Sequence, residues 1–214
     1  MTVQTQTRQH DGGLALDFPT LRRRRMLGLV TGVTVAALAT PGGDALSRSG
    51  IVRSDLRWGF GTATGVAKGV PLTIRLRLTS ATSGRPLSGH GVYLWHGDRD
   101  GAYSLYSPSL AGQNYLRGLQ TTDDTGWVTF TSVFPGAYRD EWPHLHFEAE
   151  LGVRGQISLP GDVCQQVYTT KGYEGSRDRL TGADPAGTNP HALAMACVTG
   201  DLERGFTATR TINI

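Results

Sequence analysis

Short segments in which apolar and polar residues alternate constrain the fold of this chain more than any other feature. They occupy residues 72–78, 127–131 and 144–151. Alternation with a period of two is typical of a β-strand that buries one face. Gly and Pro separate these segments, and glycine accounts for 29 of the 214 residues. The sequence therefore predicts a mainly β protein, an antiparallel β-sandwich with long loops.

The rest of the chain after residue 39 fits the same architecture. Residues 91–95 and 156–159 predict two further strands, and residues 172–192 predict a long surface loop because Gly, Asp, Pro and Asn are frequent there. Residues 152–155 predict a turn, and no segment between residue 40 and about residue 160 has a helical apolar period. We find no internal repeat or long linker, so we expect one domain over residues 40–214.

The first 39 residues differ in chemistry and predict a signal peptide that precedes the sandwich. Arg22–Arg25 stand before an apolar run, Met26–Ala39, which ends in the small-x-small pattern Ala37-Leu38-Ala39. Paired arginines before Met-Leu resemble a twin-arginine signal. We expect residues 1–39 to direct export, to a secreted, periplasmic or cell-surface location, with no stable membrane insertion after cleavage. An amphipathic or uncleaved anchor is the alternative.

The basic character of the chain arises in this leader. The sequence pI is about 9.1, but residues 1–39 hold five Arg and two Asp. Without them, Lys+Arg falls from 21 to 16 and Asp+Glu from 18 to 16, so the remaining chain is formally neutral. This charge balance predicts no nucleic-acid partner.

The two cysteines, Cys164 and Cys197, suit an exported protein. Two well-placed cysteines in an oxidising compartment usually pair. Metal ligation by this pair is the alternative, which the lack of CxxC spacing makes the weaker one.

A candidate metal centre begins with His144 and His146. Residues two apart on a strand share a face, so these two imidazoles can bind one ion, and a surface pair is the alternative. Tyr103 and Tyr138 are candidates for phenolate ligands, with core packing as their alternative. A phenol with a pKa of about 10 binds as phenolate only to a strongly acidic ion such as iron(III). Two phenolates, two imidazoles and one hydroxide would leave that ion neutral.

These residues stand in an ordered series of motifs that resembles the intradiol ring-cleavage dioxygenase family. The short spacing from Tyr138 to His144 resembles the secreted branch of that family. The resemblance covers roughly residues 50–170. Its motifs are Gly84–Gly89, Val92–Asp98, Gly101–Ser104, Tyr115–Gly118, Gln120–Asp123, Phe134–Tyr138, His144–His146 and Gln156–Pro160.

The resemblance implies an Fe(3+) cofactor held by Tyr103, Tyr138, His144 and His146, with Gln156 near the substrate. It implies an oxidoreductase of aromatic catabolism that cleaves a catechol-type ring between its two hydroxylated carbons with O2. One tyrosinate would leave the iron and help to deprotonate the catechol, which the metal orients and activates. The identity of the catechol and the oligomeric state stay open.

One departure from the family concerns the residue three positions before His144. The family usually has an arginine there, which stabilises charge developing on the ring; this chain has Glu141. A carboxylate would oppose that charge by about a few kcal/mol, unless Arg139 replaces the arginine. The alternative function is therefore a non-catalytic or weakly active exported β-sandwich that binds aromatic or carbohydrate ligands. A zinc hydrolase is weaker still, because tyrosine is a poor zinc ligand.

Other polar residues have structural interpretations. We expect His96 and Asp98 to hold the loop that presents Tyr103, and Arg117 to form an ion pair with a carboxylate. His90 and His191 are expected at the surface. Trp142 is expected either to pack on the sheet rim or to stack on an aromatic ligand.

Overall fold

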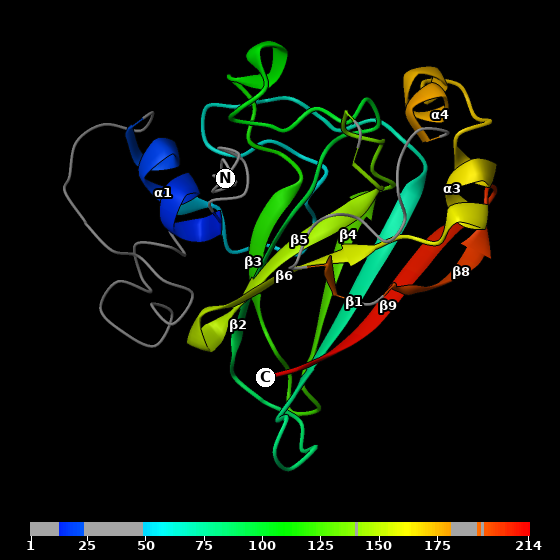
Figure 1. Cartoon of the computed structure of the whole chain (residues 1–214). Helices are drawn as coiled ribbons and strands as arrows, with labels where there is room; N and C mark the ends of the chain where they lie inside the picture. Colours follow the sequence, from blue (N-terminus) through cyan, green and yellow to red (C-terminus); the bar gives the residue numbers. More distant parts are fainter. Residues whose placement is uncertain (1–12, 24–48, 140, 181–191, 194) are drawn as a thin grey trace, which may run out of the picture.

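The computed structural model describes residues 13–23, 49–139, 141–180, 192–193 and 195–214. Two β-sheets pack face to face, with few helices (Figure 1). The prediction of a mainly β sandwich is confirmed.

One sheet has four strands in the order β4-β1-β9-β8. Their bounds are Trp127–Val133, Pro71–Thr79, Gly205–Asn213 and Cys197–Asp201. β1 pairs antiparallel with β4, as expected, but pairs parallel with β9. The sandwich is therefore mixed rather than wholly antiparallel.

The other sheet has five strands in the order β3-β2-β5-β6-β7. Their bounds are Arg117–Thr121, Gly91–Trp95, His144–Ala149, Val153–Ser158 and Ala192–Leu193. The first four are antiparallel neighbours, and β7 adds a short parallel edge. In β2 and β5 every residue is buried, which shows that both faces of these central strands are covered.

The main core lies between the sheets. Alternate residues of β1, from Leu72 to Leu78, meet the inward-facing Leu94 of β2 and Phe147 of β5 there. Since successive side chains of a strand point to opposite faces, Tyr93, Trp95 and the histidines of β5 lie on the other side of the five-stranded sheet. We call that side the outer face.

Helix α1, Gly13–Arg23, covers part of this outer face (Figure 1). Leu14, Phe18 and Leu21 recur at helical spacing and are buried in one cluster with Tyr93, Trp95 and Tyr103. Residues 13–23 belong to the segment that the sequence analysis assigned to the leader. The expectation that the fold starts after residue 39 overlooked this helical period.

The remaining helices are short. The 3-10 turns Pro108–Leu110 and Glu150–Gly152 and the helices α3, Gly161–Val167, and α4, Glu174–Leu180, join the strands. The prediction of an uninterrupted loop at 172–192 was wrong at α4, where Ser176 and Leu180 are buried against the sandwich. The turn predicted at 152–155 was also wrong, because β6 begins at Val153.

Three expectations concern the leader and the cysteines. Within the described ranges, no helix has the length and apolar character needed to cross a membrane. The predicted leader's apolar run, Met26–Ala39, lies outside those ranges, so the signal peptide stays a prediction. The sequence leaves open whether Cys164 and Cys197 are joined; in the structure Cys164 is buried in α3, Cys197 is exposed on β8, and neither is bonded.

Candidate metal centre

Two loops that end in the same tripeptide, Gly-Ala-Tyr, present the two candidate tyrosines. Gly101 begins the tripeptide of Tyr103 and has a positive φ of 78°. A Cβ on Gly101 would lie 2.2 Å from the carbonyl oxygen of Ala137, just before Tyr138. The close approach of the two loops therefore requires glycine. The rings of Tyr103 and Tyr138 meet edge to face, with centroids 5.3 Å apart.

The two candidate histidines point from β5 onto the outer face, as their spacing predicts. His146 lies in register with Trp95 on one side and Gln156 on the other. The ring of Trp95 stacks on that of His146 with a centroid distance of 4.9 Å and an interplanar angle of 6°. This stacking fixes the orientation of the His146 imidazole.

Three candidate ligand atoms converge in a buried position. Nε2 of His144 lies 2.8 Å from Nε2 of His146, and Oη of Tyr103 lies 3.1 Å from Nε2 of His146 and 3.4 Å from Nε2 of His144. All three side chains are buried. Atoms bound about 2.0–2.2 Å from one ion lie roughly 2.8–3.6 Å apart when they subtend angles of about 90–110°. The separations therefore fit the donor set of a single metal ion.

The tautomer of His144 supports this fit. Its Nδ1 lies 2.6 Å from the carbonyl oxygen of Trp142, which can only accept a hydrogen bond. Nδ1 therefore carries the proton, and Nε2 directs its lone pair toward the converging atoms. Hydrogen bonding of the remote imidazole nitrogen to a carbonyl is the usual arrangement of a metal-ligating histidine.

The structure places Tyr138 and Arg139 at the edge of this cluster. Tyr138 is partly exposed, whereas Tyr103 is only 2% exposed. Arg139 is exposed, has a positive φ of 50°, and stacks its guanidinium 5.1 Å from the centre of the Tyr138 ring. Arg139 therefore packs on the outer side of Tyr138.

Glu141 and Gln156 flank the histidines. Oε2 of Glu141 lies 3.8 Å from Nε2 of His144. Gln156 of β6 is the cross-strand neighbour of His146 and shares its face. Among the described residues, no three His, Cys, Asp or Glu side chains form a ready-made metal-binding group.

His96 and Asp98 support the Tyr103 loop, as predicted. The His96 ring is hydrogen-bonded to the Gly97 carbonyl and to the Ser132 hydroxyl, both at 2.7 Å. Complete burial lowers the pKa of His96 to about 4. Oδ1 of Asp98 accepts a hydrogen bond from the backbone N–H of Ala102 at 2.9 Å, and burial raises the pKa of this carboxyl group. Trp142 packs on the sheet rim and donates to the Leu159 carbonyl at 2.8 Å.

A second polar cluster lies beside the centre on the same face. The carboxylate of Asp17 in α1 pairs with Arg117 of β3 and accepts hydrogen bonds from the hydroxyls of Tyr93 and Tyr106. Asp17 and Arg117 are both fully buried. Burial lowers the pKa of Arg117, but the Asp17 carboxylate outweighs that effect and leaves the pKa raised.

This cluster is connected to the candidate ligands through the backbone. Arg117 donates from Nη2 to the carbonyl oxygen of Ser104, the residue after Tyr103, at 2.6 Å. It also donates from Nε to the Ser104 hydroxyl at 3.0 Å. The ion pair predicted for Arg117 is therefore confirmed, but the sequence analysis did not identify Asp17 as its partner.

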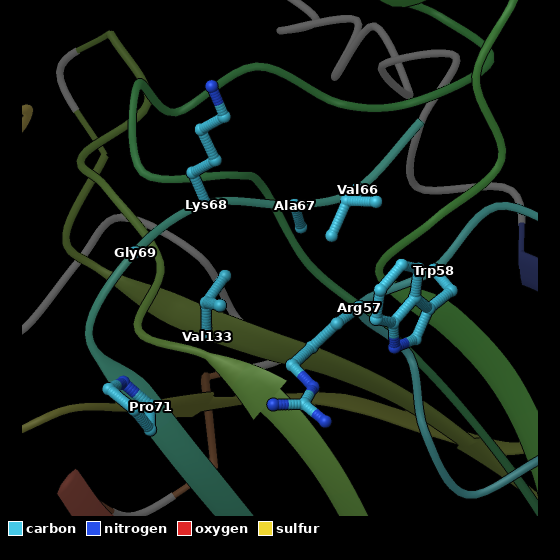
Figure 2. Close-up of a pocket in the computed structure, with 8 residues that line it drawn as sticks. All are labelled: Arg57, Trp58, Val66, Ala67, Lys68, Gly69, Pro71 and Val133. Atoms are coloured by element: carbon cyan, nitrogen blue, oxygen red, sulfur yellow. The ribbon is translucent and has the colours of Figure 1, made fainter. Parts of the chain in front are cut away.

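A separate hollow of about 340 Å³ opens elsewhere on the surface (Figure 2). It is lined by Arg57, Trp58, Val66, Ala67, Lys68, Gly69, Pro71 and Val133. None of the candidate ligands lines it. The converging donor atoms, rather than this hollow, therefore define the candidate site.

Comparisons with known proteins find dioxygenases among the proteins similar to this chain. Residues 59–155 match the family model described as Dioxygenase. A stretch of 67 residues is 39% identical to a chlorocatechol 1,2-dioxygenase of Rhodococcus opacus, and covers 30% of this chain and 26% of that enzyme.

Solved structures share the fold. A crystal structure of a dioxygenase superposes with a TM-score of 0.63 at 22% identity, over 77% of this chain and 86% of the other. An intradiol ring-cleavage dioxygenase from Tetranychus urticae superposes with a TM-score of 0.59 at 22% identity and the same coverage.

Proposed function

We propose that this chain, which belongs to the intradiol ring-cleavage dioxygenase family, uses iron(III) and O2 to cleave a catechol-type ring between its two hydroxylated carbons. The observation that carries the proposal is the convergence of Tyr103 Oη, His144 Nε2 and His146 Nε2 within 2.8–3.4 Å. A sandwich that served only as a scaffold would not require these buried donors to face one another.

Bound iron(III) would supply Lewis-acid activation and a template that orients the catechol toward O2. The protein side chains divide the remaining work. His144, His146 and Tyr103 are buried and form the fixed donors. Tyr138 is the more exposed tyrosine, so its Oη is the better-placed base for the proton of an incoming catechol hydroxyl. Gln156 shares the face of His146 and is positioned to donate a hydrogen bond to the substrate.

The test is the iron content, the visible spectrum and the oxygen uptake of the purified full chain with catechol. We expect about one iron per chain, a tyrosinate-to-iron absorption band that shifts when catechol is added, and oxygen consumption. Tyr103→Phe should abolish all three, whereas Tyr115→Phe, a buried tyrosine in a different cluster, should retain them. A colourless chain that takes up no iron would overturn the proposal.

The second candidate function is binding of aromatic ligands without turnover. Glu141 favours it, because a carboxylate lies 3.8 Å from His144 where the family pattern has an arginine. The two functions separate in one measurement. A binder gives a catechol-induced spectral shift without oxygen uptake, whereas the dioxygenase gives both.

We also propose that the chain is exported by the twin-arginine route, on the basis of Arg22–Arg25 and the apolar run after them. That route carries folded proteins, which suits a protein that must bind its metal before export. Replacement of Arg24 and Arg25 by Lys, followed by cell fractionation, tests the proposal. An unchanged distribution between cytoplasm and exterior would contradict it.

A further inference from the structure

Glu141 differs from the family pattern, and its surroundings suggest a role of its own. The backbone N–H of Glu141 donates to the carbonyl oxygen of Tyr138 at 2.9 Å. This bond holds Glu141 against the backbone of Tyr138, shortly before the histidine strand. The carboxylate approaches His144, and its Oε2 atom is shielded from solvent.

The distance from that oxygen to His144 is close to the distance that separates two ligands of one metal ion. Oε2 lies 3.8 Å from Nε2 of His144. Two ligands of one ion are separated by roughly 2.8–3.6 Å at adjacent positions and by about 4.0–4.4 Å at opposite ones. The Glu141 oxygen therefore lies between these two arrangements. Rotation about its side-chain dihedrals, which have several staggered minima, changes this distance.

Charge favours the same role. Tyr103 and Tyr138 as phenolates supply two negative charges to iron(III), and the ion needs a third to be neutral in a buried site. The carboxylate of Glu141 can supply it, in place of a hydroxide. An arginine at this position would instead add a positive charge beside the ion.

We propose that Glu141 is a further metal ligand, so that this chain binds iron through two tyrosines, two histidines and one glutamate. The inference rests on the proposed function, because it concerns the same ion. It goes beyond that function in two respects. The carboxylate strengthens iron binding, and it weakens binding of the dianionic catechol, which must compete with it for the same ion.

The experiment compares the full chain with Glu141→Gln, which keeps the shape of the side chain and removes its charge. Iron(III) affinity is measured by competition with a chelator, and the tyrosinate absorption band is recorded without and with catechol. We expect Glu141→Gln to weaken iron binding by at least about 10-fold and to shift the band. We expect it to tighten catechol binding to the iron-loaded protein. Glu203→Gln, an exposed glutamate in the β8–β9 turn, is the matched control and should change nothing.

The outcomes separate the two proposals. If the wild-type chain binds iron and Glu141→Gln leaves both the affinity and the band unchanged, the ligand role is wrong and the proposed function stands. If the wild-type chain binds no iron, both fail. Thermal unfolding of the iron-free proteins shows whether each variant folds, and Glu141→Ala provides a second variant. Iron should raise the Tm of the wild type more than that of either variant, because the stabilisation by a ligand grows with the logarithm of its affinity.

Discussion

The outer face of the five-stranded sheet has two halves, which both bury polar groups but differ in how these groups are paired. In the half under α1, opposite charges meet: the Asp17 carboxylate faces Arg117, and the hydroxyls of Tyr93 and Tyr106 donate to it. Glu148 in the same half accepts from the backbone N–H of Leu14 at 3.1 Å and pairs with Arg154 at 3.1 Å. Both carboxylates have donors supplied by the chain itself.

In the other half, groups of the same kind converge. Nε2 of His144, Nε2 of His146 and Oη of Tyr103 are all atoms of a type that binds metal ions, and Oε2 of Glu141 lies 3.8 Å from Nε2 of His144. Buried acceptors that face one another are unfavourable unless a shared proton or a cation lies between them. The comparison shows how a polar cluster that stabilises the fold differs from one that binds a ligand. The first is a set of complementary charges and hydrogen-bond partners, whereas the second brings together the atom types that bind a metal ion.

The largest effect should follow from removal of a candidate metal ligand in the half that contains the histidines. His146→Gln keeps the size of the side chain and a polar end, but removes the imidazole. We expect iron(III) affinity to fall by more than about 100-fold, since even loss of a residue that only orients a ligand costs 10–100-fold. Chelator competition measures this change. His90→Gln, at a partly exposed position away from the site, is the control, and equal affinities for the two variants would refute the metal centre.

The second-largest effect concerns the half of the outer face that lies under α1. Asp17→Asn in the full chain leaves the buried guanidinium of Arg117 without its counter-charge, which should lower the free energy of unfolding by about 3–5 kcal/mol. Urea unfolding measures it. Asp178→Asn, where the carboxylate is 82% exposed, should cost little. The double change Asp17→Leu with Arg117→Met should restore most of the stability, because it removes both buried charges. If Asp17→Asn were as stable as the wild type, α1 would not be docked in solution.

The third effect is a pH dependence of stability that arises from His96, a buried histidine that is not a candidate metal ligand. His96 has a folded-state pKa of about 4, below its ordinary value of 6.5, because burial disfavours its charged form. The unfolded chain therefore binds more protons between these values, so the stability that His96 contributes is present above pH 6.5 and is lost as the pH falls toward 4. The loss should reach at most about 3 kcal/mol.

Urea unfolding of the iron-free chain at pH 7 and at pH 4.5 checks this expectation. His96→Asn, which keeps a hydrogen-bonding side chain but cannot gain a proton, should show a smaller loss of stability between the two values. Equal losses for the wild type and the variant would mean that His96 already accepts a proton in the folded state.

The two halves also differ in how well the sequence predicts them. His144 and His146 were identified because a spacing of two on a strand sends both side chains to one face, and Tyr103 and Tyr138 because each stands in a short motif of the family. The half under α1 was not identified. Its carboxylate lies 100 positions before Arg117, and no local pattern encodes so distant an ion pair.

Part of that missed half was nevertheless predictable. Leu14, Phe18 and Leu21 have the spacing of an amphipathic helix, but the arginine run after them led to the whole segment being interpreted as a leader. The strands β3, β8 and β9 were not predicted as strands either. In β9 the polar residues Thr207 and Thr209 alternate with the buried Phe206 and Ala208, with little of the long aliphatic character that marks β1. Pairing with β1 and β8 determines its conformation.

The smallest effect concerns Arg139, at the rim of the second half. Its guanidinium lies over the Tyr138 ring and its side chain is exposed, so Arg139→Ala should cost less than about 1 kcal/mol of stability. The sequence analysis assigned Arg139 the role of the family's arginine, which predicts a larger effect on catalysis than on folding. The observed position, outside Tyr138 rather than beside the histidines, predicts a kcat close to that of the wild type. Steady-state oxygen uptake decides between the two: a tenfold fall in kcat, equivalent to about 1.4 kcal/mol of transition-state stabilisation, would show that Arg139 turns inward when substrate binds.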